Sequence, residues 1–381
     1  MSRPRHSLRV ITQPGLEEVT ARELVALGLC PQAQAGAVVV TGGLRAVYAA
    51  NLRLRTATRV LVQLARFEAP SFHALTRRLG DLDLDPWLPP AGVVHARATS
   101  HKSRLHHTGA IEARVVEALQ ARGREAAPGR APGERPVAQL FVRLVRDRCT
   151  VSVDTSGAPL HRRGYRLAVA KAPLRETLAA AVVLESGYRP PAPLVDPLCG
   201  AGTLAIEAAL LGRSLAPGRR RRFAFMDAAG FNRGLWASVV GEARAEEQTW
   251  PKPQVFASDR DAGAVAASRD NAARADVEGD IAFTRASLTA CAAPPREHEG
   301  SEPRGYLVTN PPYGRRVGGG DLRDLHARLG QVARERFAGY RAAIVSSDAA
   351  LVGHTGLGLR PARRLTSGGL PVTIFVGDVP R

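Results

Sequence analysis

The 381-residue chain is predicted to be an α/β protein in which two smaller α+β units precede a doubly wound parallel sheet. Two observations predict this fold class. From about residue 167, short apolar runs alternate with helical segments, and such alternation is typical of parallel sheets. A glycine-rich turn directly follows the first of these runs. In open α/β sheets, ligands bind beyond the carboxyl ends of the strands, where such a turn lies.

The amino-terminal part shows the mixed patterns of two small α+β units. In the first unit, residues 8–11 and 37–40 have the composition of short strands, and apolar residues at helical spacing follow each of them. In the second unit, residues 93–97 and 139–145 alternate like half-buried strands. We therefore expect three domains, at residues 1–60, 61–156 and 157–381.

The third domain contains five apolar runs that predict parallel strands. They are Leu194–Pro197, Val255–Asp259, Ile281–Thr284, Tyr306–Thr309 and Ala342–Ser346. A further run, Val372–Val376, follows Gly368 and Gly369 and predicts a last strand that enters antiparallel through a hairpin.

The composition excludes several classes of protein. Hydrophobic residues make up 45% of the chain and charged residues 23%, as in ordinary globular proteins. The four cysteines form no Cys-x-x-Cys pair, so we expect no bound metal. No uncharged run approaches the roughly 18 residues that span a bilayer, and the first residues lack the apolar core of a signal peptide. We expect a cytoplasmic protein without a membrane partner.

The charge of the chain is strongly positive. Lysine and arginine number 53 against 35 acidic residues, a net charge of +18. Residues 1–166 hold 25 basic and 13 acidic residues, or +12, and the remainder holds 28 and 22, or +6. A field of this sign attracts polyanions, so the excess predicts contact with nucleic acid, above all by the amino-terminal part.

The glycine turn after the first parallel strand predicts a cofactor site. In the segment 194–203, Asp196 precedes a turn that contains Gly200 and Gly202, and glycines let a ligand approach the backbone closely. The phosphate-binding pattern GxxxxGK[ST] is absent, and Ala205 stands where a dinucleotide fingerprint has its third glycine. S-adenosylmethionine suits the turn better, because it has no phosphate and its ammonium group can face Asp196. A purely structural tight turn is the alternative.

The second parallel strand also ends in an acid. Asp259 closes the run 255–259, and a carboxylate at this place can accept both ribose hydroxyls of a nucleoside. Asp261 is a nearby alternative, and a surface aspartate often only caps the next helix. We assign the ribose contact to Asp259.

The fourth parallel strand ends in a stiff turn rich in acceptors. Pro311 and Pro312 fix the backbone, Asn310 supplies a side-chain oxygen, and Tyr313 supplies a flat ring. Acceptors from Asn310 and from the Pro311 carbonyl would hold the N–H groups of an exocyclic base amine and stabilise the charge that develops on its nitrogen. Tyr313 would stack on an extruded base. The alternative is that the Pro-Pro turn has only a structural role and ends a buried strand.

Together these segments resemble the THUMP-domain class I RNA guanine-N2 methyltransferases, especially the bacterial large-subunit ribosomal RNA type. The resemblance covers nearly the whole chain. Besides Asp196–Thr203 and Asn310–Gly314, the segments that carry it are Pro14–Glu18, Tyr48–Arg53, Ser103–His106, Val153–Gly157 and Leu160–Arg166 followed by Ala172–Leu178.

The resemblance implies a ferredoxin-like first domain, a THUMP RNA-binding second domain and a Rossmann-like methyltransferase domain. It implies S-adenosylmethionine as cofactor and an RNA substrate, ribosomal or transfer RNA. The expected cofactor residues are Asp196, Gly200, Ala201, Gly202, Thr203 and Asp259, with Ser287 where the family often carries an acid for the adenine amine. Catalysis is expected at Asn310, Pro311, Pro312 and Tyr313. RNA contacts are expected at Lys102, Arg104, His106, Arg162, Arg163, Arg220 and Arg221.

Other functions stay open at this point. The Asn-Pro-Pro-Tyr segment also occurs in adenine-N6 DNA and glutamine methyltransferases, although the attached basic module favours RNA. A transfer RNA methyltransferase and a non-catalytic RNA-binding assembly factor are further alternatives. Ala205 and the lack of a placed catalytic histidine disfavour a nicotinamide dehydrogenase.

Overall fold

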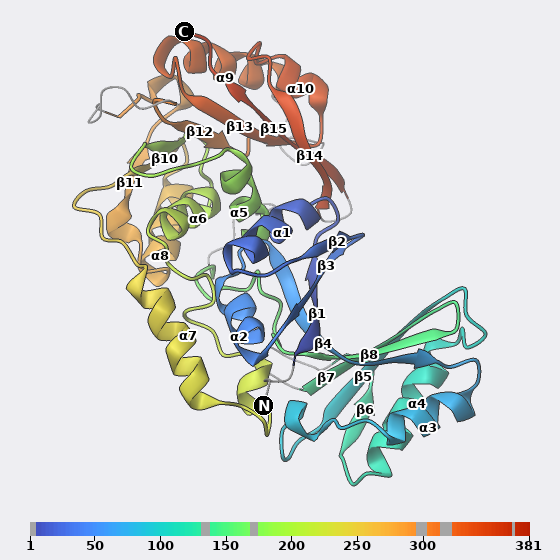
Figure 1. Cartoon of the computed structure of the whole chain (residues 1–381). Helices are drawn as coiled ribbons and strands as arrows, with labels where there is room; N and C mark the ends of the chain where they lie inside the picture. Colours follow the sequence, from blue (N-terminus) through green and yellow to red (C-terminus); the bar gives the residue numbers. More distant parts are fainter. Residues whose placement is uncertain (1–4, 131–137, 168–173, 295–302, 313–321, 368–369) are drawn as a thin grey trace. The chain divides into compact units, whose positions relative to one another are not determined.

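The computed structural model describes residues 5–130, 138–167, 174–294, 303–312, 322–367 and 370–381 (Figure 1). The chain divides into two compact units. The first comprises residues 1–12, 21–160 and 220–241, and the second comprises residues 13–20, 161–219 and 242–381. No helix among the described residues is long and apolar enough to cross a bilayer.

The first unit is built on one eight-stranded sheet with the order β2-β3-β1-β4-β8-β7-β5-β6. Its strands are β1 (His6–Thr12), β2 (Gln32–Gln34), β3 (Ala37–Gly42), β4 (Ala57–Glu68), β5 (Val94–His101), β6 (Ala126–Pro128), β7 (Ala138–Val145) and β8 (Arg148–Asp154). The β5–β6 and β5–β7 pairs are parallel and the other pairs are antiparallel. The helices of this part are α1 (Glu17–Ala26), whose first four residues belong to the second unit, α2 (Leu44–Arg53), α3 (Phe72–Gly80) and α4 (Thr108–Gln120).

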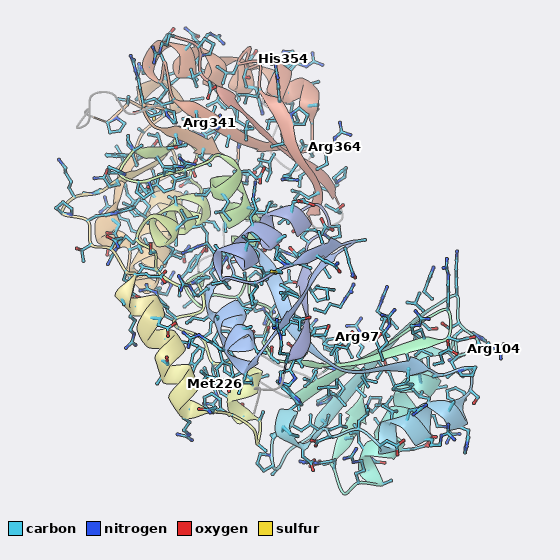
Figure 2. All side chains as sticks on the ribbon, in the orientation of Figure 1. Arg97, Arg104, Met226, Arg341, His354 and Arg364 are labelled. Atoms are coloured by element: carbon cyan, nitrogen blue, oxygen red, sulfur yellow. The ribbon has the colours of Figure 1, made fainter. Side chains whose placement is uncertain are left out.

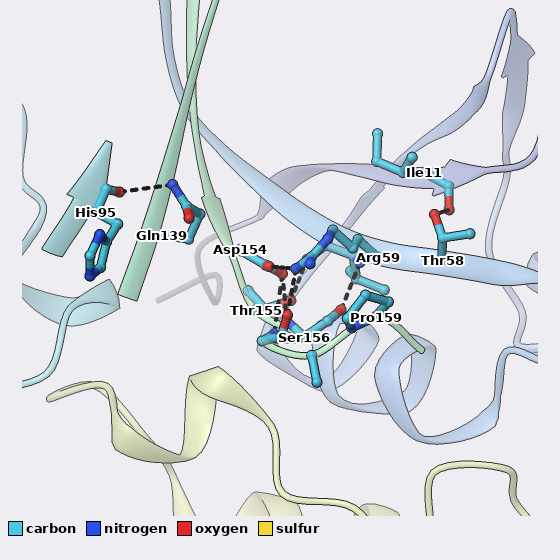
Figure 3. Close-up of polar contacts among 12 residues, drawn as sticks. Ile11, Thr58, Arg59, His95, Gln139, Asp154, Thr155, Ser156 and Pro159 are labelled. Carbon is cyan, nitrogen blue, oxygen red and sulfur yellow. Dashed lines mark hydrogen bonds and ion pairs between the residues drawn. The ribbon is translucent and has the colours of Figure 1, made fainter. Parts of the chain in front are cut away.

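The pairing of β4 with β8 joins the two halves of this sheet (Figure 3). Arg59 of β4 forms an ion pair with the buried Asp154 at the end of β8. Just beyond, Thr155 donates from Oγ1 to the carbonyl of Val60 at 2.7 Å, and Ser156 donates from Oγ to Asn51 Oδ1 at 2.6 Å. The segment Val153–Gly157, singled out in the sequence, therefore forms the hydrogen-bonded corner that fixes the end of β8.

The second unit is built on a seven-stranded sheet with the order β11-β10-β9-β12-β13-β15-β14. Its strands are β9 (Leu194–Asp196), β10 (Val255–Asp259), β11 (Ile281–Arg285), β12 (Tyr306–Thr309), β13 (Arg341–Ser346), β14 (Arg360–Ser367) and β15 (Leu370–Asp378). The first five are parallel, whereas β15 is antiparallel to both β13 and β14.

Helices pack on both faces of this sheet (Figure 1). They are α5 (Glu176–Glu185), α6 (Thr203–Gly212), α8 (Ala262–Arg274), α9 (Leu322–Arg336) and α10 (Ala349–Gly353). Helix α7 (Arg233–Ala245) begins in residues of the first unit and contributes no residue to the core clusters of this sheet. One core cluster joins α5, α6 and α8 to the sheet, and a second joins α9 to the opposite face. Helices α5 and α6 are almost fully buried, and they are accordingly apolar on nearly every side.

The strand order reverses beside β9. The chain runs from β9 through β10 to β11 at one edge and then returns to β12 on the other side of β9. Such a reversal leaves a crevice outside the carboxyl ends of the two adjacent strands, and ligands bind there. The glycine turn follows β9 and the Asn-Pro-Pro segment follows β12, so both predicted motifs lie at this switch point.

The predicted fold class is confirmed. Each of the five parallel strands occurs where its apolar run predicts it, and β15 pairs antiparallel with β14 and β13. Gly368 and Gly369, which the hairpin prediction used, lie outside the described residues. The three-domain division stays a prediction. The structure adds two facts about these boundaries. One continuous sheet spans the predicted boundary at residue 60, and residues 220–241 belong to the first unit.

Candidate active site

The two motifs at the switch point are in direct contact. The hydroxyl of Thr309, the last residue of β12, donates to Asp196 Oδ1 at 3.0 Å. Asp196 ends β9, and both side chains are almost fully buried, at 1% and 0% exposure. This hydrogen bond fixes the carboxylate of one motif to the strand that leads into the other.

The glycine turn has a backbone that glycine alone adopts easily. Gly200 has a φ of +53° and Gly202 a φ of +78°, in the left-handed region that disfavours side chains. A Cβ at Gly202 would lie 3.0 Å from the Cβ of Ser268, whereas a Cβ at Gly200 would meet no atom within 4 Å. The turn is therefore packed against α8 at Gly202 and open at Gly200.

Helix α8 holds the turn through two side chains. Ser268 donates from Oγ to the carbonyl of Gly200 at 2.6 Å, and Asn271 donates from Nδ2 to the carbonyl of Ala201 at 3.1 Å. Arg274 in turn donates to Asn271 Oδ1 at 2.5 Å and to the carbonyl of Tyr165 at 2.8 Å. These residues are three apart and so lie along one face of the helix. Two consecutive carbonyls of the turn are thus held by a rigid element.

Asp196 carries an unusual carboxyl group. Burial raises its pKa to about 7, although hydrogen bonds from Thr309 and from the Leu198 N–H lower it. A buried carboxylate is costly unless a positive group compensates it. The site therefore favours a cationic ligand beside Asp196.

Asp259 links β10 to the glycine turn. Its Oδ2 accepts a hydrogen bond from the N–H of Gly200 at 3.0 Å, and its Oδ1 accepts one from the N–H of Asp261 at 3.0 Å. Asp261, the sequence alternative, instead caps α8 by accepting from Gly263 and Ala264. Asp259 is thus the acid at the glycine turn, with oxygen lone pairs left for further donors.

Asn310 has an unsatisfied acceptor at the same edge. Its Oδ1 is buried and accepts no hydrogen bond from the residues that the structure describes. Such a group is costly unless a partner arrives. Pro311 is buried and Pro312 is half-buried, while Tyr313 lies outside the described residues.

These residues fit S-adenosylmethionine. Asp196 suits its ammonium group, the open side of Gly200 admits close approach, and Asp259 faces the turn with acceptor capacity. Asn310 Oδ1, which accepts no hydrogen bond from the described residues, could accept one from a reactant with N–H groups. Among the described residues, no group of three or more His, Cys, Asp or Glu side chains could hold a metal ion.

Comparison with known proteins agrees with this geometry. Residues 163–357 match the family described as RMKL-like, methyltransferase domain, and residues 7–61 match the RlmL ferredoxin-like domain. The chain belongs to the RMKL-like methyltransferase family. Its second unit accordingly has the fold of S-adenosylmethionine-dependent methyltransferases, and its first unit begins with a ferredoxin-like domain.

Individual relatives support the same assignment. A protein of Syntrophotalea carbinolica named ribosomal RNA large subunit methyltransferase K/L is 36% identical over 96% of this chain and 52% of its own length. The chain thus spans about half of that relative. A putative RNA methyltransferase of Synechocystis is 32% identical over 95% of this chain and 94% of its own length. The crystal structure of SMU.472, a putative methyltransferase complexed with SAH, aligns over 100% of both chains at 29% identity with a TM-score of 0.85.

The other predicted residues are spread over both units. Lys102, Arg104 and His106 are exposed around the loop after β5, where the Arg104 side chain is 76% exposed (Figure 2). Ser287 is exposed after β11 and lies 3.0 Å from Thr289, hydroxyl to hydroxyl. Ala201 and Thr203 lie in and after the glycine turn. Arg162 and Arg220 are exposed.

The structure corrects the expected RNA contact at Arg163. Arg163 is 3% exposed, and its Nε lies 2.8 Å from Oε1 of the fully buried Glu207. An arginine inside the core cannot reach a phosphate, so its role is to neutralise Glu207 of α6. Arg221 is half-buried and donates to the carbonyls of Ala158 and Pro159 at 2.6 Å. These bonds engage part of the guanidinium that was expected to contact RNA.

Three residues of the site were not predicted from the sequence. Thr309 orients Asp196, while Ser268 and Asn271 hold the glycine turn. The one available signal was the spacing of Ser268 and Asn271 by three in an alanine-rich helix, which puts both polar residues on the same helical face.

Proposed function

We propose that the chain is an S-adenosylmethionine-dependent RNA methyltransferase that modifies the N2 amino group of a guanine, in large-subunit ribosomal RNA. The observation that carries the proposal is the contact between Thr309 and Asp196, because it joins a cofactor turn to an acceptor-rich turn at one switch point. The names of the relatives support an RNA substrate and, for one of them, ribosomal RNA. Such a substrate would place the protein in the cytoplasm.

The cofactor would be held by Asp196, by the backbone of Gly200 to Gly202 and by Asp259. When bound, S-adenosylmethionine supplies an electrophilic methyl group on a sulfonium. Asp196 would pair with the ammonium, and Asp259 would accept from the ribose hydroxyls. Ser268 and Asn271 would keep the turn in the shape that admits the cofactor.

Asn310 would orient the target amine. A guanine N2 amino group is a poor nucleophile because its lone pair is delocalised into the ring. Asn310 Oδ1 and the Pro311 carbonyl would each accept one N–H of the amine, which aims the lone pair at the incoming methyl and stabilises positive charge on nitrogen. No strong base is required, since the proton can leave after transfer. Much of the rate would come from positioning, which contributes up to about 7–11 kcal/mol. Tyr313 would stack on the base.

The RNA would be held mainly by the first unit, in which we place the THUMP domain at residues 61–156. The exposed side chains of Lys102, Arg104 and His106 lie there, and the net charge of +12 before residue 167 favours a polyanion. Arg162 and Arg220 would add contacts from elsewhere, whereas Arg163 is left out because it is buried.

The experiment is nucleoside mass spectrometry of RNA from cells with and without the gene. Ribosomal RNA, transfer RNA, messenger RNA and genomic DNA are digested separately. We expect N2-methylguanosine to fall in the large-subunit ribosomal RNA of the deletion strain. Loss from transfer RNA alone would move the substrate to transfer RNA, and loss of N6-methyladenine from DNA would overturn the assignment.

A further inference from the structure

We propose that the uncovered face of the first unit's sheet is an RNA-binding surface built by Arg66, Arg97 and Arg143. These residues come from β4, β5 and β7 and are called here the arginine face. The proposal rests on the proposed function, because it names where the RNA substrate is held. None of these residues was singled out in the sequence.

The strand register puts these side chains on one face. Arg66 of β4 pairs with Thr150 of β8, Thr150 pairs with Arg143 of β7, and Arg143 pairs with Thr99 of β5. Residues directly opposite one another in neighbouring strands project to the same side of a sheet. Arg97 is two residues from Thr99 along β5 and therefore shares that side. One row of alternating guanidinium and hydroxyl groups thus crosses four strands.

The opposite face is the one that the helices cover. Val151, Val142 and Ala98, which alternate with the row, are 0%, 1% and 5% exposed, and α4 packs against β5 through buried residues such as Ile111. By contrast, the three arginines are exposed. Figure 2 shows Arg97 on the side of the sheet away from α3 and α4. Among the described residues of the first unit, the arginine face is therefore exposed.

Within the described part of the chain, Arg66, Arg97 and Arg143 form no ion pair, and Glu68, the acid that shares this face on β4, lies opposite Arg148 of β8. The ion pairs described in this unit use other arginines, such as Arg59, Arg104 and Arg114. Burial and the charge of Arg143 both lower the pKa of Arg9 on β1, so positive charge accumulates across the sheet. Exposed cations of one sign on a rigid surface attract a polyanion and release its counterions.

The chemistry of the face matches an RNA backbone. Guanidinium groups bind phosphate in a bidentate manner, and threonine hydroxyls commonly donate to phosphate and sugar oxygens. Two strand spacings separate Arg66 from Arg143, or about 10 Å. Phe141 of β7 pairs with Arg97 and is half-buried, so an aromatic ring lies beside a guanidinium on the same face. Aromatic rings on open sheets stack unpaired bases in other RNA-binding modules.

The test compares two double variants that remove equal charge from opposite sides of the same unit. Arg66→Gln/Arg143→Gln changes the arginine face, and Arg77→Gln/Arg78→Gln changes two exposed arginines of α3. A fluorescein-labelled RNA stem–loop is titrated with each full-length protein at several salt concentrations, without a methyl donor. Thermal unfolding confirms that both variants are folded.

We expect Arg66→Gln/Arg143→Gln to weaken RNA binding about tenfold or more and to reduce the salt slope by about 2. The control should change affinity much less. Equal losses in both double variants, or an unchanged salt slope, would show that only total charge matters and would overturn the proposal. Because no methyl donor is present, a protein that modified another base would still show the effect. Failure of the guanine assignment is thus distinguishable from failure of this surface.

Discussion

Two residues at the switch point have features that suit ligand binding but lower the stability of the folded protein. Asp196 is buried with its pKa raised to about 7, and the buried Asn310 Oδ1 accepts no hydrogen bond from the described part of the chain. Both arrangements cost folding free energy. The sequence predicted Asp196 and Asn310 as site residues because each lies at the end of an apolar strand run. It did not predict that the Thr309 hydroxyl, next to Asn310, would bind Asp196. Arg163 shows the converse, since nothing local in the sequence separates a buried arginine from an exposed one.

Asp196→Asn should stabilise the protein and weaken its binding of the cofactor. A carboxyl with a raised pKa binds more protons in the folded state than in the unfolded state, so it makes stability fall as pH rises from about 4 to 7. The variant lacks this penalty. We expect its free energy of unfolding at pH 8 to exceed that of the wild type by at most about 4 kcal/mol, with a much smaller difference at pH 4. Urea unfolding at both pH values measures this.

The same variant tests the charge assignment. Calorimetry with S-adenosylhomocysteine should show wild-type affinity rising as pH increases towards 7, because the ionised carboxylate attracts the ligand's ammonium. Asp196→Asn should bind weakly with little of this pH dependence. Equal affinity of both proteins at pH 8 would contradict the role of the charge.

Asn310→Ala should abolish most methyl transfer while leaving RNA binding nearly intact. Removing one preorganised hydrogen-bonding group from an active site lowers kcat by about 10²–10³-fold. Methyl incorporation under saturating cofactor and RNA measures kcat, and titration of the RNA measures binding. Parallel losses in both would indicate a structural role instead.

At the scale of elements, the sequence predicts a strand where its own residues form a pattern, but it does not predict pairings between distant segments. Continuous apolar runs predicted the parallel strands β9 to β13, because buried strands carry little else. The three-residue strands β2 and β6 are too short to leave a pattern. The pairing of β4 with β8 brings together residues about 90 positions apart in the chain, which no local pattern encodes.

Asn271→Asp tests the hold of α8 on the glycine turn. The substitution keeps size and can still pair with Arg274, but it replaces the donor to the Ala201 carbonyl with an oxygen. We expect affinity for S-adenosylhomocysteine to fall about tenfold, or about 1.4 kcal/mol.

Two controls on the same helix separate positioning from stability. Asp270→Asn alters the exposed face of α8, and Val265→Ala removes buried apolar contact away from the turn carbonyls. Asp270→Asn should bind normally, and Val265→Ala should lower stability more than cofactor affinity. If Val265→Ala weakened the cofactor as much as Asn271→Asp, the effect would be one of general stability.

For the whole molecule, charge and cofactor chemistry are divided between the two units. The first unit holds 26 basic and 12 acidic residues, or +14, the second unit holds 27 and 23, or +4, and the cofactor turn lies in the second unit. RNA affinity should therefore fall steeply as salt increases, because phosphate contacts release counterions. Affinity for S-adenosylhomocysteine, held at a buried site, should change little. Titrations of both ligands over the same salt series check this, and equal slopes would contradict the division.

In the proposed reaction, the Asn310 edge of the second sheet directs a guanine N2 amine to the methyl donor. The most direct measurement uses the purified protein, labelled S-adenosylmethionine and two matched large-subunit ribosomal RNA transcripts, one with guanosine and one with inosine, which lacks only the 2-amino group. We predict methyl incorporation into the guanosine transcript, recovered as N2-methylguanosine, and none into the inosine transcript. Equal incorporation into both transcripts would contradict the account.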